Sequence, residues 1–115
     1  MTRLNMQELL SRVEQDRELL HELLSIFVDE FPVKLQELRE VVAREDLAQA
    51  VMVSHALNGM LANLSITRAA GCAGEIGQIA RSGKTAALKQ ALEALEQEVR
   101  GLLPEIQGHL GEARR

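Results

Sequence analysis

The stretch that decides the fold is residues 46–68, DLAQAVMVSHALNGMLANLSITR, in which twenty-one residues without Lys, Arg, Asp or Glu separate Asp46 from Arg68. Apolar residues recur along it at spacings of three and four, which predicts an amphipathic helix. The run is a poor candidate for a membrane span, which needs about 20 predominantly apolar residues, because polar residues interrupt it repeatedly. The predicted buried side holds Leu47, Ala50, Val53, Ser54, Leu57, Leu61 and Leu64.

The one histidine of this stretch, His55, is predicted to face solvent on the opposite side of the helix. A solvent face normally carries Lys and Glu, but the residues around His55 are small or uncharged: Ala48, Val51, Met52, Asn58, Gly59 and Ala62. Gly59 costs a helix interior about 1 kcal/mol relative to alanine. The pattern therefore indicates close approach of another molecule to the imidazole. On composition alone, a bundle helix that is apolar all round with a structural histidine is the simpler interpretation.

The sequence from His55 to Gly59, HALNG, resembles the H-x-L-K-G signature of histidine-containing phosphotransfer (HPt) domains. The preceding residues 23–57 are similar to that family's long helix, short turn and histidine-bearing helix, and residues 66–83 are similar to its next helix. The resemblance covers roughly Leu4 to Ile106. Two positions depart from the family pattern: Asn58 stands where a lysine is usual, and Ser65 where a glycine is common.

The resemblance implies that His55 is the phospho-acceptor of a phosphorelay and exchanges a phosphoryl group with the aspartate of a response-regulator receiver domain. Gly59 would leave clearance for the receiver, and Asn58 would hydrogen-bond the phosphoryl oxygens without bringing positive charge. The apolar docking surface would consist of Ala48, Val51, Met52 and Ala62. The partners would be a receiver domain, a hybrid sensor histidine kinase, or both. The domain would be a carrier without kinase activity, and the receiver would supply Mg²⁺.

Composition limits the other possibilities. A chain of 115 residues with 46% hydrophobic and 26% charged residues predicts one globular domain, residues 1–115. The net charge of −4, with no Lys/Arg cluster, argues against nucleic acid as a partner. We find no signal-peptide pattern, metal-ligand set, catalytic triad or nucleotide-binding loop, and we expect a cytoplasmic monomer. The single cysteine, Cys72, is interpreted as a small buried hydrophobe.

The predicted architecture is all-α: an antiparallel up-down four-helix bundle with a short additional N-terminal helix. We expect helices over residues 6–14, 17–44 and 47–64, with a kink or split at Pro32 in the second. A fourth helix, capped by Ser65 or Thr67, would run to residue 81, and its glycines are interpreted as sites of tight helix packing. The last helix would start near Thr85 and weaken at Gly101 and Pro104, with a frayed tail from about residue 108 to 115.

Two alternatives belong to other functional classes. The domain could be a pseudo-phosphotransfer module that binds a receiver or kinase without carrying phosphate, which the departures at Asn58 and Ser65 would favour. It could also be a structural bundle that dimerises through the uncharged face of the His55 helix. Dimers in solution without receiver binding would identify the second alternative.

Overall fold

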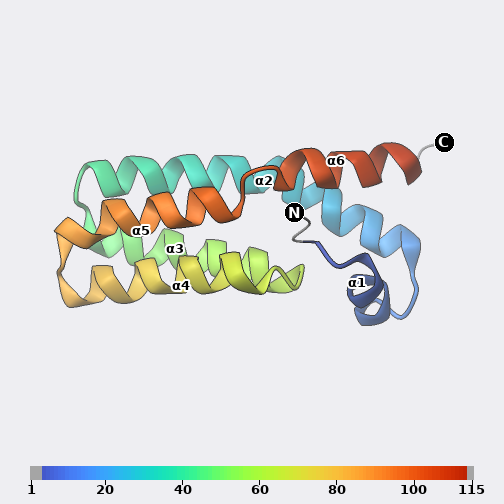
Figure 1. Ribbon diagram of the computed structural model, residues 1–115, viewed down its shortest axis with the longest axis horizontal. Coiled ribbons are helices and arrows are strands. Elements are labelled where there is room, and N and C mark those ends of the chain that lie inside the picture. Colours follow the sequence, from blue (N-terminus) through green and yellow to red (C-terminus); the bar gives the residue numbers. More distant parts are fainter. Residues whose placement is uncertain (1–3, 114–115) are drawn as a thin grey trace.

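The computed structural model describes residues 4–113, which form six α-helices and no strand. The helices are α1 (Met6–Arg12), α2 (Arg17–Ala43), α3 (Leu47–Asn63), α4 (Thr67–Ser82), α5 (Thr85–Glu98) and α6 (Leu102–Ala113). Figure 1 shows α3, α4, α5 and the second half of α2 as antiparallel neighbours, with α6 beside the first half of α2 and α1 at the same end. The predicted all-α bundle with a short extra N-terminal helix is confirmed.

The core is continuous along the bundle, and apolar residues at spacings of three and four along the helices supply most of it. Seven apolar residues of α2 at spacings of three and four are all buried: Leu20, Leu24, Phe27, Phe31, Leu35, Leu38 and Val42. On α3 the predicted inner side is likewise buried, except for Leu47, which is half-buried. None of the helices in the described part of the chain is long and apolar enough to cross a membrane.

Side-chain caps begin the first three helices. The Asp46 carboxylate accepts a hydrogen bond from the Gln49 N–H at 3.2 Å and so fixes the start of α3. Asn5 and Asp16 cap α1 and α2 in the same way. The predicted cap of α4 by Ser65 or Thr67 is wrong, because the N-cap is the buried Ile66, which makes no side-chain cap bond.

The helices of the α2–α3–α4 hairpins end in tight left-handed turns. At the end of α3, Ser65 has φ 58°, and the Ile66 and Ser65 N–H groups donate to the Leu61 and Ala62 carbonyls at 3.0 and 2.9 Å. This arrangement is a Schellman motif, which satisfies the last carbonyls of a helix. Glu45 takes the same position after α2, with φ 55°. These turns set α3 antiparallel to both neighbours and fix the height of each residue relative to the next helix.

Three expectations about helix continuity need correction. The last predicted helix is two helices, because Gly101 adopts φ 81° and separates α5 from α6. The tail is not frayed over residues 108–113: α6 continues to Ala113, since Leu110 is buried against the core. The first helix ends at Arg12 rather than residue 14, because Glu14 has φ 54°. The end of the predicted tail, residues 114–115, lies outside the described residues.

Pro32 does not split α2, which continues from Arg17 to Ala43. Proline removes the hydrogen bond to the Val28 carbonyl, but packing on both sides holds the helix together. Phe27 and Phe31 are buried and stacked, with ring centroids 4.6 Å apart. Figure 1 shows the first half of α2 inclined to the second half.

Candidate functional site

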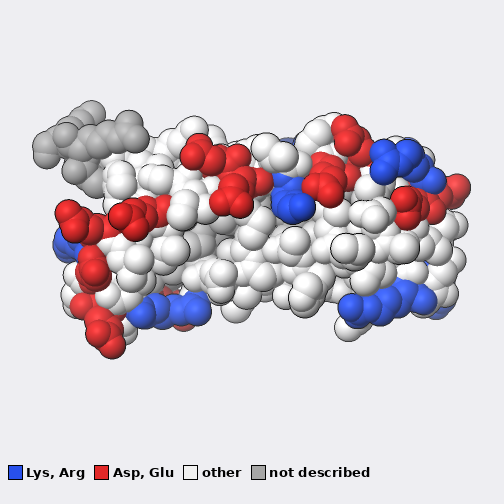
Figure 2. Space-filling model, turned by 180° about the vertical axis from the view of Figure 1, so that it is seen from behind, with Lys and Arg blue, Asp and Glu red and all other residues white. Residues whose placement is uncertain are grey.

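The candidate site lies on the outer side of α3, at the middle of the uncharged stretch. His55 is exposed, as predicted, and its imidazole makes no hydrogen bond to any residue of the described chain. The inner side of the same helix is closed, since Leu57 and Leu61 have no exposed area. Figure 2 views the molecule from the side of α2 and α3 and shows a broad area without charged groups, bordered above by Asp and Glu with interspersed Lys or Arg. A free imidazole on this area can accept an electrophile without first losing an internal contact.

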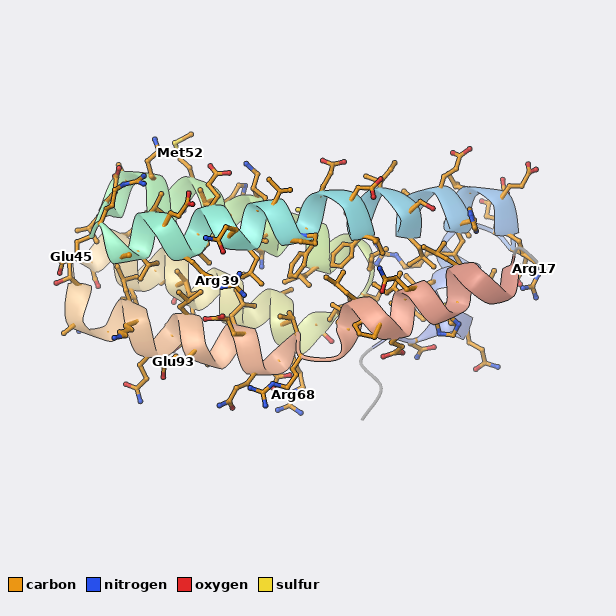
Figure 3. All side chains as sticks on the ribbon, turned by 90° about the horizontal axis from the view of Figure 1, so that it is seen from above. Arg17, Arg39, Glu45, Met52, Arg68 and Glu93 are labelled. Atoms are coloured by element: carbon orange, nitrogen blue, oxygen red, sulfur yellow. The ribbon has the colours of Figure 1, made fainter. Side chains whose placement is uncertain are left out.

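Three residues around His55 form an exposed, mostly small-residue surface on α3. Ala48 and Ala62 are exposed, and Met52 is 64% exposed. Figure 3 shows Met52 pointing away from the bundle. Val51 is half-buried and packs partly against the core. Ala48, Met52 and Ala62 are exposed as predicted, whereas Val51 is only partly exposed, and the contact of all four with a partner stays a prediction.

Asn58 turns toward α4 rather than toward His55. Its Nδ2 donates to the Ala70 carbonyl at 2.7 Å, which ties α3 to α4 through a side chain that is only half-exposed. The amide therefore already has a structural contact within the domain. Its expected hydrogen bond to phosphoryl oxygens stays a prediction, and the structure gives this residue a second, internal role.

The glycines near the site fall into two kinds. A Cβ added at Gly77 would lie 3.0 Å from the Ser54 Oγ, and one added at Gly74 would lie 3.6 Å from the Asn58 Nδ2. The predicted role of α4 glycines in tight packing is therefore confirmed for Gly77, which lets α4 approach α3. A Cβ at Gly59 would meet nothing within 4 Å. Packing within the domain therefore does not explain why residue 59 is a glycine.

The second helix adds apolar residues that sequence reasoning did not identify. Val33 is 68% exposed and Ile26 is 51% exposed on α2. They are seven residues apart and so share one side of the helix. In antiparallel helices, residues at similar distances from the connecting turn lie at similar heights. Val33 lies ten residues before the end of α2, and His55 lies eight residues after the start of α3, so this count would have identified Val33 as a neighbour in height.

Two ion pairs involve charged residues of α2. Lys34 Nζ lies 3.1 Å from the Glu37 Oε2 on α2, and both side chains are partly exposed. On the other side of α2, Arg39 pairs with Glu96 of α5 at 3.0 Å, and Figure 3 shows Arg39 directed toward α5. No group of three His, Cys, Asp or Glu side chains in the described residues could hold a metal ion.

The thiol of Cys72 is half-buried on α4. Burial raises the pKa of the Cys72 thiol, and the Glu98 and Glu75 carboxylates add to the rise while Arg68 opposes it. A higher pKa keeps the group as a thiol near neutral pH, which is the less nucleophilic form. This agrees with the interpretation of Cys72 as an unreactive thiol, although the residue is half-buried rather than buried as predicted.

Comparison with known proteins agrees with this geometry. The family model described as "Hpt domain" matches residues 22–107. The crystal structure of histidine-containing phosphotransfer protein B (HptB) from Pseudomonas aeruginosa superposes with a TM-score of 0.86, covers 96% of each chain and shares 21% sequence identity. No curated protein sequence matched the chain. Because the family model spans most of the sequence, including the His55 helix and both its neighbours, this chain belongs to the family of Hpt domains, the histidine phosphotransfer domains of two-component phosphorelays.

Proposed function

We propose that His55 carries the phosphoryl group of this Hpt domain and exchanges it with the aspartate of a response-regulator receiver domain. The observation that supports this assignment is an exposed imidazole, free of hydrogen bonds within the described chain, at the centre of a helix face without charges. His21 and His109 are half-buried and lie on α2 and α6, outside that face.

The transfer step needs little from the domain beyond the nucleophile. The lone pair of an unprotonated ring nitrogen of His55 attacks the phosphorus of the aspartyl phosphate. A P–N bond forms as the P–O bond to the aspartate breaks, and the bonding electrons leave with the aspartate carboxylate. The hydrogen on the other ring nitrogen stays in place. The reverse reaction returns the phosphoryl group to a receiver.

The partner supplies the remaining chemistry in this proposal. The receiver brings the acceptor or donor aspartate and the Mg²⁺ ion, and the domain is a phosphocarrier without kinase activity of its own. Its partners are a receiver domain, a hybrid sensor histidine kinase, or both, and it works as a cytoplasmic monomer. Membership of the Hpt family supports the carrier role.

The docking surface extends over two helices. On α3 it includes Ala48, Val51, Met52 and Ala62, with Gly59 leaving clearance beside His55. On α2 it includes Val33, whose exposed fraction of 68% is the largest among the exposed large apolar residues. Exposed apolar residues gathered beside a reactive group are typical of a protein interaction site.

The decisive experiment replaces His55 by glutamine and incubates the protein with a phosphorylated receiver. Wild type should acquire one acid-labile phosphate on His55 by mass spectrometry, and His55→Gln should acquire none while keeping its circular dichroism spectrum. His21→Gln is the matched control and should label like wild type. Undiminished labelling of His55→Gln would place the acceptor elsewhere.

A further inference from the structure

The uncharged α3 face leaves a phosphoryl group on His55 without a cation from its own helix. Between Asp46 and Arg68 the sequence has no Lys or Arg, and Asn58 stands where the family resemblance leads one to expect lysine. The Asn58 amide donates to the Ala70 carbonyl at 2.7 Å. A phosphoryl group nevertheless adds negative charge that is stabilised by cationic hydrogen-bond donors. Within this domain, a cation at the height of His55 must therefore come from a neighbouring helix.

The flank of α2 that faces α3 carries Lys34. This residue comes four positions before Leu38 and seven before Val41, both buried, so it lies at the edge of the core. Arg39 marks the opposite flank, because it reaches Glu96 on α5. The α3 and α5 helices pack on different sides of α2, so Lys34 lies on the α3 side of α2.

Lys34 also lies at the same height as His55. The two helices are antiparallel and joined by the short turn at residues 44–46. Lys34 comes nine residues before the end of α2 at Ala43, and His55 comes eight residues after the start of α3 at Leu47. At about 1.5 Å of rise per residue, their heights agree to within about 2 Å.

The α3 surface next to His55 is low over Ala56 and Gly59, whereas the exposed Met52 lies one turn earlier on the same side. On α3, Ala56 and Gly59 lie on the side of His55 that faces α2, and a Cβ at Gly59 would meet nothing within 4 Å. Packed helix axes are about 8–10 Å apart. A flexible lysine side chain can cross this distance toward a phosphoryl group that projects from the imidazole.

The present partner of Lys34 holds it weakly. Its Nζ lies 3.1 Å from the Glu37 Oε2, one turn along the same helix, and the two side chains are 39% and 41% exposed. Ion pairs this exposed contribute little to stability, so the ammonium can leave Glu37 for a more highly charged partner at small cost.

Other cations are less well placed. Arg12 Nη1 donates to the Ala62 carbonyl and the Ser65 Oγ at the far end of α3. Arg68 pairs with Glu98 of α5. Arg81 lies fourteen residues after the start of α4. His55 lies eight residues before the end of α3, which matches the height of a residue about eight positions after the start of α4, so Arg81 is displaced by roughly 9 Å along the helix.

We propose that Lys34 leaves Glu37 and donates hydrogen bonds to the phosphoryl oxygens on phospho-His55, in place of the lysine that Asn58 replaces. This inference rests on His55 as the acceptor. In this proposal α2 takes part in the chemistry as well as in docking. Gly59 then has a second role, because the absence of a side chain at this position leaves room for Lys34 to extend toward the phosphoryl group.

The test uses phosphoramidate, a small phosphoryl donor that needs no docking surface. The His55 nitrogen attacks its phosphorus, a P–N bond to the imidazole forms, and ammonia leaves as the donor P–N bond breaks. Lys34→Gln should slow His55 labelling about tenfold, as expected for loss of one charge-assisted hydrogen bond. Lys34→Arg should keep most of the rate. Lys89→Gln, an exposed lysine change on α5, is the matched control and should have no effect.

A second substitution that restores the labelling rate separates a direct role of Lys34 from a structural one. Asn58→Lys added to Lys34→Gln should restore much of the labelling rate, because it returns a cation to the α3 face. Labelling of Lys34→Gln at the wild-type rate would overturn the inference while leaving His55 as the acceptor. Slow labelling that Asn58→Lys does not restore would also overturn it. Absence of His55 labelling in wild type, by phosphoramidate and by a phosphorylated receiver, would instead overturn the proposed function itself.

Discussion

The side of α3 that meets α4 and the side that meets solvent are built from similar small and polar residues, for different reasons. Toward α4, Ser54 is 1% exposed, Asn58 binds the Ala70 carbonyl, and Gly77 makes room for the Ser54 Oγ. Toward solvent, His55 and Gly59 have no internal contact that requires them. Small residues on the first side are explained by packing, whereas those on the second require a partner outside the chain.

The largest expected effect tests this difference with one substitution at two glycines. Gly77→Leu should lower the free energy of unfolding by about 1–3 kcal/mol, because its side chain must displace Ser54 or separate α3 from α4. Gly59→Leu should leave stability unchanged or raise it by up to about 1 kcal/mol, because leucine is a better helix former than glycine. Urea unfolding followed by circular dichroism measures both. Equal losses at the two positions would remove the distinction between the two sides.

The next effect concerns docking rather than folding. Gly59→Glu should reduce phosphoryl transfer from a receiver at least about tenfold, because binding would bury a carboxylate without a partner. Labelling by phosphoramidate should fall much less, since that donor is small. Gly108→Glu is the matched control on α6, where a Cβ also meets nothing within 4 Å. Receiver transfer at the wild-type rate in Gly59→Glu would show that clearance at this position is not needed.

A smaller effect is expected at Asn58. Asn58→Ala should cost about 1 kcal/mol of stability through loss of the hydrogen bond to the Ala70 carbonyl. If this internal role is the main one, phosphoramidate labelling of His55 should stay within about twofold of wild type, far less than the loss from a charge-assisted contact. Comparing urea unfolding with labelling rates on the same variant separates the two roles. A large loss of labelling with unchanged stability would mean that Asn58 acts mainly by contacting the phosphoryl group.

Periodicity predicted the parts of the fold that depend on apolar spacing. The α2 stripe, the closed side of α3 and the exposure of His55 all follow from which side of a helix each residue occupies. The break at Gly101 was harder to predict, because the stripe of Leu95, Leu102 and Ile106 continues across it. Apolar spacing cannot distinguish a continuous helix from two helices that bury the same side.

The candidate site was predictable on α3 and only partly on α2. His55 and its neighbours share one helix, so spacing alone places them together. Lys34 and Val33 lie at about the height of His55 because of the turn between two helices, and this depends on where α2 ends and how the helices are paired. The hydrogen bond from Asn58 to Ala70 depends on the rotamer and on the approach of α4, neither of which has a signal in the sequence.

The smallest expected effect tests the second departure from the family pattern, at the end of α3. Ser65 has φ 58°, a conformation that costs a residue with a side chain about 1 kcal/mol relative to glycine. Its Oγ accepts a hydrogen bond from Arg12 Nη1 at 2.6 Å, which offsets part of that cost. Ser65→Gly relieves the strain but loses the bond, so the net change in unfolding free energy should be within about 0.5 kcal/mol.

A double-mutant cycle can measure how far the hydrogen bond from Arg12 compensates for the backbone strain at Ser65. In an Arg12→Ala background the hydrogen bond is already absent, so Ser65→Gly should raise the free energy of unfolding by about 1 kcal/mol, the full advantage of glycine at this φ. A gain of the same size with and without Arg12 would mean that the arginine does not compensate for the serine. A larger gain without Arg12 would mean that α1 stabilises the end of α3 in a chain that lacks glycine there. The departure at Ser65 would then be explained within the fold, as packing explains Gly77, and would carry no implication for phosphotransfer at His55.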